Sequence, residues 1–199
     1  QLLAAIDYVR THAERYHADP AAVIPMGFSA GGHLAGCAGL MWNKPEVYRP
    51  LKKKSAAFRP DGVVMCYPVV TSGPMAHRGS MDNLLGDRVE ELAEIVSLEK
   101  RVRRGAPPFF LWHTADDTCV PMENTLLLAK ALEARGVDVE ARIYPHGRHG
   151  QSLADHTAFA PDEARHISVP CAVWVQHCDA WLQRHFGAGR REEVSAERK

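Results

Sequence analysis

The hydrophobic positions of this chain form short apolar runs that alternate with stretches of helical periodicity. Residues 22–24, 62–70 and 109–112 are apolar runs typical of buried strands. Residues 137–143 alternate apolar and polar positions, which indicates a half-buried strand. Because strands and helices alternate along the chain, the pattern predicts an α/β fold: a mostly parallel sheet with helices on both faces.

Apolar residues recur at helical spacing between these runs. The pattern predicts helices over residues 2–16, 30–42, 121–135 and 170–186, with shorter helical pieces between 80 and 104. Pro121 suits the first turn of its helix, and Gly136 suits the end of the same helix. Residues 43–60 are lysine-rich and flanked by prolines, so we expect them to form a loop.

The length of the chain, 199 residues of which 46% are hydrophobic, suits a single domain with a sizeable core. We expect this domain to cover residues 1–186 and a flexible charged tail to cover 187–199. The first residue is Gln1, and the chain opens inside a predicted helix. This favours a polypeptide that lacks an N-terminal part, including the place where a signal peptide would stand.

Charge and composition argue against several classes of function. The 24 basic and 24 acidic residues give a formal net charge of zero, and the basic clusters at 52–54 and 101–104 are short, so we expect no nucleic-acid partner. No apolar run approaches the roughly 18 residues of a membrane span. The five cysteines include no C-x-x-C pair, which favours reduced thiols and a cytoplasmic location.

The first chemical signal follows the first apolar run. Residues 25–34 read P-M-G-F-S-A-G-G-H-L, and Gly27 to Gly31 fit G-x-S-x-G, the pattern of a nucleophile elbow. At such a turn the hydroxyl of Ser29 stands above the sheet, and a side chain at Gly27 or Gly31 would collide with the neighbouring strand or helix. The pattern alone also fits a glycine-rich turn with an incidental serine, so its interpretation depends on the residues that follow.

A serine hydroxyl needs a base to take its proton, and the base needs an orienting carboxylate. Asp116 and Asp117 follow the third predicted strand, and His146 and His149 follow the fourth. The order serine, aspartate, histidine is that of the α/β-hydrolase elbow. The flanking Gly150 lets its loop turn sharply, which favours His149 as the base. The residues alone leave both aspartates open, one of them serving only as turn chemistry.

Other histidines have simpler interpretations. His146 and His149 as a pair of metal ligands lack a nearby third ligand, so we expect neither a metal nor a cofactor. His33 lies one helical turn beyond Ser29 and is expected to pack or to form hydrogen bonds. His113 ends a strand and is expected to be structural.

Three segments resemble the α/β-hydrolase superfamily, and within it the bacterial acetyl esterases, acetylxylan esterases and feruloyl-esterase-like proteins. They are M-G-F-S-A-G-G-H-L-A, W-H-T-A-D-D-T-C-V-P-M-E-N-T-L-L-L-A-K-A-L and Y-P-H-G-R-H-G. In this family the acid stands in D-x-x-V-P, which Asp117 fits and Asp116 does not, and the base stands in the loop that holds His149. The resemblance therefore implies a Ser29, Asp117 and His149 triad, with the backbone N–H of Ala30 in the oxyanion hole.

The same resemblance implies a second oxyanion loop, H-G-G-G or similar, and several strands ahead of the elbow. The 28 residues before Ser29 contain no such motif, in agreement with a missing N-terminal part. The expected function is a serine hydrolase that cleaves small acetyl-type esters, including acylated carbohydrate, through an acyl-enzyme. Two alternatives stay open: a serine peptidase of the prolyl-oligopeptidase type, and an inactive truncated or non-catalytic hydrolase-like domain.

Overall fold

A computed structural model of the chain describes residues 1–159, 162, 167 and 169–187. Within this part, one sheet holds four parallel strands in the order in which they occur along the chain. The strands are β1 (Met26–Phe28), β2 (Val63–Cys66), β3 (Phe109–Thr114) and β4 (Val139–Tyr144). The predicted charged tail lies outside the described residues from 188 onward, so this division of the chain stays a prediction.

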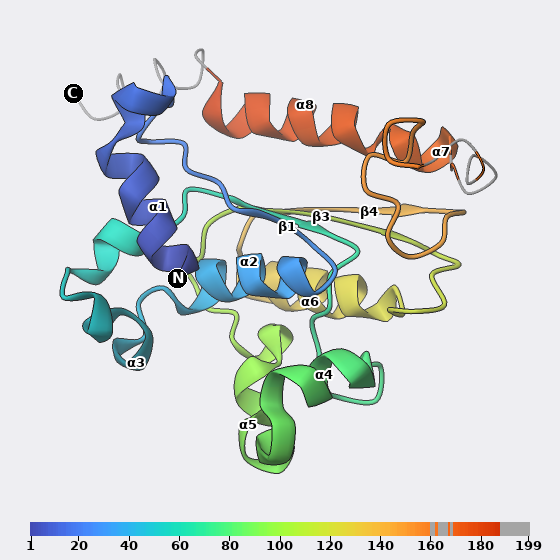
Figure 1. Cartoon of the computed structure of the whole chain (residues 1–199), viewed down its shortest axis with the longest axis horizontal. Helices are drawn as coiled ribbons and strands as arrows, with labels where there is room; N and C mark the ends of the chain where they lie inside the picture. Colours follow the sequence, from blue (N-terminus) through green and yellow to red (C-terminus); the bar gives the residue numbers. More distant parts are fainter. Residues whose placement is uncertain (160–161, 163–166, 168, 188–199) are drawn as a thin grey trace.

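Helices cover both faces of the sheet, as the sequence predicts. The described α-helices are α1 (Leu2–Thr11), α2 (Ala30–Met41), α3 (Pro45–Tyr48), α4 (Arg78–Leu85), α5 (Val89–Val96), α6 (Glu123–Ala134), α7 (Val169–Ala172) and α8 (Trp174–Phe186). Figure 1 shows α2 and α6 on one face of the sheet and α8 on the other, with α4 and α5 beyond α2 and α6.

The two central strands supply the core on both sides of the sheet. The core under α2 and α6 contains Val63, Met65, Phe109 and Leu111. The core under α8 contains Val64, Cys66, Phe110 and Trp112. Successive side chains of a strand point to opposite faces, so a strand that is buried on both faces needs a continuous apolar run. This is why β2 and β3 are the most clearly predicted strands of the sequence.

The first strand lies later in the sequence than predicted. Residues 22–24 are not part of the sheet, and β1 instead occupies Met26–Phe28, directly before Ser29. Pro25 therefore precedes the strand and needs no amide donor there. Its carbonyl oxygen accepts a hydrogen bond from the N–H of Val64 at 3.0 Å, which continues the pairing between the two strands.

Two further segments differ from the sequence expectation. Pairing in β2 stops at Cys66, because Tyr67 has a positive φ of 37° and Pro68 has no N–H; residues 67–71 stay buried without extending the strand. Residues 43–60 form α3 and two 3-10 turns, Arg49–Leu51 and Ser55–Phe58, instead of a plain loop. The buried ring of Phe58 anchors this segment in a small core with Leu3 and Ile6.

The helix boundaries also refine the sequence pattern. The opening helix ends at Thr11 and is followed by a 3-10 turn over Ala13–Tyr16. Helix α6 ends before Gly136, which takes a positive φ of 65° and donates its N–H to the carbonyl oxygen of Glu133 at 2.9 Å. The last predicted helix is divided into α7 and α8 at Val173.

All five cysteines are free thiols. Cys119 is exposed, whereas the other four are partly or fully buried. Burial raises the pKa of the Cys37 thiol to about 12 and that of Cys178 to about 11, so these groups stay protonated at neutral pH. None of the described helices combines the length and the apolar character that a membrane crossing requires.

Candidate active site

Ser29 occupies the single position between β1 and α2. Its backbone angles, φ 54° and ψ −120°, are unusual for a residue with a side chain and mark a strained turn. Neighbouring backbone holds this turn: the N–H of Ser29 donates to the carbonyl oxygen of Cys66 at 2.9 Å, and its carbonyl oxygen accepts from the N–H of Val69 at 3.2 Å. The predicted strand, elbow and helix therefore occur in the predicted order.

The two glycines of the elbow motif have different surroundings. A Cβ atom on Gly27 would lie 2.0 Å from the carbonyl oxygen of Gly31, so only glycine fits at this position. A Cβ atom on Gly31 would meet nothing within 4 Å, and the prediction of a collision there is wrong. The tight contact belongs instead to Gly32, where a Cβ atom would lie 2.9 Å from the Cβ of Pro68.

This difference gives a matched pair of variants. Gly27→Ala is expected to lower the free energy of unfolding by about 3 kcal/mol or more, because the strand and the helix must separate to admit the methyl group. Gly31→Ala is expected to leave stability unchanged or to raise it by up to about 1 kcal/mol, since alanine favours helix over glycine. Urea denaturation of both variants measures these changes, and equal stabilities of the two would contradict the contact at Gly27.

The hydroxyl of Ser29 contacts His149, and His149 in turn contacts Asp117. Ser29 Oγ is 2.7 Å from His149 Nε2, and His149 Nδ1 is 2.6 Å from Asp117 Oδ2. The three residues follow β1, β4 and β3 respectively, so they meet at the carboxyl edge of the parallel sheet. Nucleophilic catalysis needs a nucleophile in contact with a base, and a base in contact with an orienting carboxylate, and these three groups are arranged in this way.

The hydrogen bonds of Asp117 define the protonation of this group. Its side chain is fully buried, and Oδ1 accepts the backbone N–H groups of Cys119 and Val120, both at 2.9 Å. Burial would raise the pKa of Asp117, but hydrogen bonds from His113, His149 and these N–H groups hold that pKa well below its usual range. The ionised carboxylate accepts from Nδ1–H of His149, which leaves Nε2 to accept the proton of Ser29.

Among the described contacts, those of Asp116 and His146, the other candidates for the acid and the base, do not involve Ser29 and lie elsewhere. Asp116 Oδ1 accepts the backbone N–H of Gly147 at 2.7 Å, and Asp116 Oδ2 lies 3.4 Å from His146 Nδ1. The side chain of His146 is 77% exposed, whereas that of His149 is 18% exposed. The structure thus brings Asp117 and His149 to Ser29. Asp116 instead connects the loop after β3 to residues 145–150 after β4, which we call the histidine loop.

His33 packs beside the elbow as the sequence predicts. Its Nε2 donates to the carbonyl oxygen of Val96 at 2.8 Å, and burial lowers its pKa. Sequence reasoning missed Tyr67, whose ring lies edge-on to His149 with centroids 5.0 Å apart. The Tyr67 hydroxyl accepts the N–H of Ser152 at 3.0 Å. No sequence pattern predicts this contact, because Tyr67 belongs to an apolar run that is typical of a strand.

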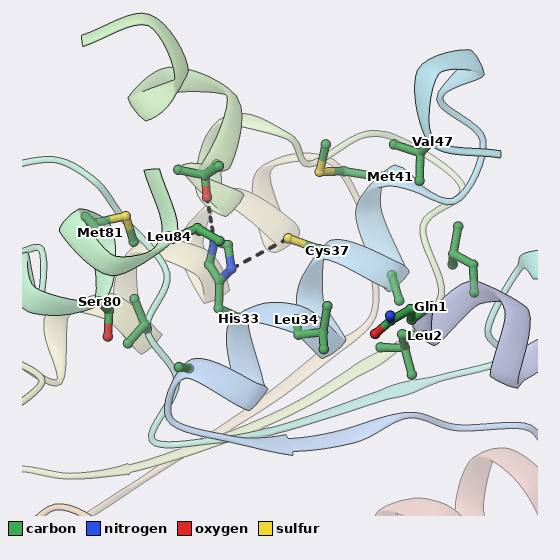
Figure 2. Close-up of a pocket in the computed structure, with 15 residues that line it drawn as sticks. Gln1, Leu2, His33, Leu34, Cys37, Met41, Val47, Ser80, Met81 and Leu84 are labelled. Carbon is green, nitrogen blue, oxygen red and sulfur yellow. Dashed lines mark hydrogen bonds between the residues drawn. The ribbon is translucent and has the colours of Figure 1, made fainter. Parts of the chain in front are cut away.

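An apolar pocket lies beside the elbow, shown in Figure 2. Its cavity of about 480 Å³ is lined on the α2 side by Ala30, His33, Leu34 and Cys37. The labelled Met81 and Leu84 of α4 face it from the other side. In the described part of the chain, no group of three histidine, cysteine or acidic residues is arranged to hold a metal ion.

Known proteins with similar sequences and structures include several carbohydrate-active hydrolases. A solved structure of an acetyl ester-xyloside bifunctional hydrolase from Caldicellulosiruptor lactoaceticus matches with 38% identity and a TM-score of 0.75, over 92% of this chain and 64% of that one. Endo-1,4-beta-xylanase B from Butyrivibrio fibrisolvens is 35% identical over 157 residues, 78% of this chain. Acetylxylan esterase from Xylanibacter ruminicola is 30% identical over 148 residues, 71% of this chain.

The similarity covers part of each of these proteins. The chain spans about a quarter of the two curated relatives, 25% of the xylanase and 28% of the acetylxylan esterase. The BD-FAE family model matches residues 2–132, more than half of this chain. This match agrees with the parallel sheet, with the helices on both of its faces and with the similarity to the solved acetyl ester-xyloside hydrolase. The chain therefore belongs to the BD-FAE family and has the α/β-hydrolase fold.

Proposed function

We propose that the protein is a serine hydrolase that cleaves small carboxylic esters of the acetyl type through an acyl-enzyme intermediate. The observation that carries this proposal is the series of hydrogen bonds from Ser29 Oγ to His149 Nε2 and from His149 Nδ1 to Asp117 Oδ2. The relatives named acetylxylan esterase and acetyl ester-xyloside hydrolase support acylated carbohydrate as the substrate class.

In this mechanism Ser29 Oγ attacks the carbonyl carbon of the ester while its proton passes to His149 Nε2. Asp117 keeps the imidazole oriented and stabilises the positive charge that forms on it. The proton on Nε2 then passes to the alcohol oxygen as the carbon–oxygen bond breaks, which leaves the acyl group on Ser29. Water attacks this intermediate with the same base, and the acid product leaves.

The negative charge on the carbonyl oxygen needs hydrogen-bond donors in the transition state. Ala30 is the first residue of α2, so its backbone N–H has no carbonyl partner within the helix. This N–H lies at the N-terminus of the helix, which is the positive end of the helix dipole. We assign this N–H to the oxyanion hole. We assign the apolar cavity, which Ala30 helps to line, to an apolar part of the ester.

The two alternatives, a serine peptidase and an inactive hydrolase-like domain, differ from an ester hydrolase in the activity that they predict. A serine peptidase would share the D-x-x-V-P segment from Asp117 to Pro121, but none of the relatives reported above carries a peptidase name. Comparing p-nitrophenyl acetate with a peptide p-nitroanilide separates the two activities. An inactive hydrolase-like domain would show neither activity.

A fluorophosphonate probe tests the candidate nucleophile directly. We expect one probe molecule per folded chain, attached to Ser29, because only a serine activated by its base attacks phosphorus rapidly. Peptide mapping of the labelled protein identifies the site, and the Ser29→Ala variant is the matched control without label. The His149→Ala variant should label far more slowly. Absence of label on a folded sample would favour the inactive alternative.

A further inference from the structure

The carboxylate oxygen that faces His149 has a second histidine partner. Asp117 Oδ2 lies 2.6 Å from His149 Nδ1 and 3.2 Å from His113 Nε2. His113 is the penultimate residue of β3, and its side chain is fully buried. The mechanism above uses His149 alone, so the contact with His113 is left without a role in it.

The surroundings of His113 fix where its proton lies. Nε2 faces two acceptors, Asp117 Oδ2 and the carbonyl oxygen of Val120 at 2.9 Å. A nitrogen between two acceptors must carry a hydrogen, so Nε2–H donates to both in a three-centre hydrogen bond. The shorter distance gives Val120 the stronger share of this bond, and Asp117 receives the remainder.

The other ring nitrogen ties His113 to a helix. His113 Nδ1 lies 2.8 Å from Thr125 Oγ1, on the first turn of α6, and Thr125 is fully buried as well. In the tautomer that carries its proton on Nε2, Nδ1 accepts from the Thr125 hydroxyl. The imidazole is therefore held at both nitrogens and cannot turn without breaking a buried hydrogen bond.

We propose that His113, oriented by Thr125, is a positioning residue that holds Asp117 Oδ2 toward His149. This inference rests on the proposed function, because it assigns His113 to the same hydrolytic site. Backbone N–H groups hold Oδ1, and His113 is the one protein donor besides His149 that the described contacts give to Oδ2. The two ends of the carboxylate are thus held separately, and its plane is fixed. The strand β3 and the helix α6 supply the rigid support.

Three variants of the protein test this role. His113→Leu removes all three hydrogen-bond contacts of the ring at similar size. His113→Gln keeps a donor near the position of Nε2, and Thr125→Val removes only a hydroxyl. The control is His177→Leu, which removes a histidine that hydrogen-bonds to the Tyr144 hydroxyl at 2.7 Å outside the candidate site. Each variant is checked for folding by circular dichroism, and its kcat, KM and pH profile are measured on p-nitrophenyl acetate.

We expect His113→Leu to lower kcat about 100-fold with KM within about twofold, because a misplaced carboxylate affects the reacting groups and not substrate binding. His113→Gln should restore kcat to within about tenfold of the parent, and Thr125→Val should lower it about threefold. The acidic limb of the kcat/KM profile should move to lower pH in His113→Leu and Thr125→Val, since Asp117 then supports the protonated form of His149 less well.

A folded His113→Leu or Thr125→Val variant with the parent's kcat and pH profile would overturn the inference. A limb that moves to higher pH would also overturn it, because His113 would then only compete with His149 for the carboxylate charge. If His113→Leu does not fold, Thr125→Val decides by the same measurements. Activity that survives in Ser29→Ala would instead contradict the proposed function, so the two failures are distinguishable.

Discussion

Replacing Ser29 with alanine is expected to lower kcat for p-nitrophenyl acetate by at least about 10⁴-fold. Without the hydroxyl no acyl-enzyme forms, and hydrolysis would have to proceed by direct attack of water beside His149. The Ala30 N–H remains in place, so a small residual rate above the uncatalysed reaction is consistent with the mechanism. The variant keeps the same Cβ atom at the strained φ of 54°, so the fold is expected to survive.

The measurement needs a folded variant and a matched serine. Circular dichroism and urea denaturation establish that Ser29→Ala folds as the parent does. Ser55→Ala, in the 3-10 turn Ser55–Phe58 outside the candidate site, is expected to keep full activity. A Ser29→Ala variant that hydrolyses the ester at a substantial fraction of the parent rate would exclude Ser29 as the nucleophile, whatever the geometry of its neighbours.

The parts of the fold that follow from the sequence are those in which local pattern and burial agree. The runs 63–66 and 109–112 are apolar because both faces of β2 and β3 are covered. The sequence places the first strand too early because residues 22–24 are apolar but lie outside the sheet, whereas β1 contains Gly27 of the elbow. Sequence hydrophobicity does not show where pairing partners begin and end.

Some features of the candidate site could likewise be predicted from the sequence, and others could not. Ser29, Asp117 and His149 follow the ends of β1, β3 and β4, so their order along the chain could be predicted from spacing and resemblance. The role of His113 could not, because its contacts with Asp117, Val120 and Thr125 depend on how the loop after β3 folds back. The open space around a Cβ atom at Gly31 could not be predicted, because the pattern G-x-S-x-G does not show which of its glycines is in close contact with neighbouring backbone.

The second large effect is expected from Asp117→Asn, which should lower kcat by about 10⁴-fold. The carboxamide oxygen belongs at the Oδ1 position, where the N–H groups of Cys119 and Val120 need an acceptor. The NH₂ group then stands at the Oδ2 position and donates to His149 Nδ1. This places the proton of the imidazole on Nε2, where it faces Ser29 Oγ and prevents His149 from taking the hydroxyl proton.

Asp116→Asn is the matched control, with the same chemical change one residue away. Its carboxamide oxygen can still accept the N–H of Gly147, so we expect kcat to stay within about tenfold of the parent. Steady-state kinetics of both variants on p-nitrophenyl acetate, at matched folded concentration, measure the difference. Equal losses would mean that the two aspartates act together in holding the histidine loop. A large loss confined to Asp117→Asn would instead identify the charge and acceptor at Oδ2 as the feature on which His149 depends.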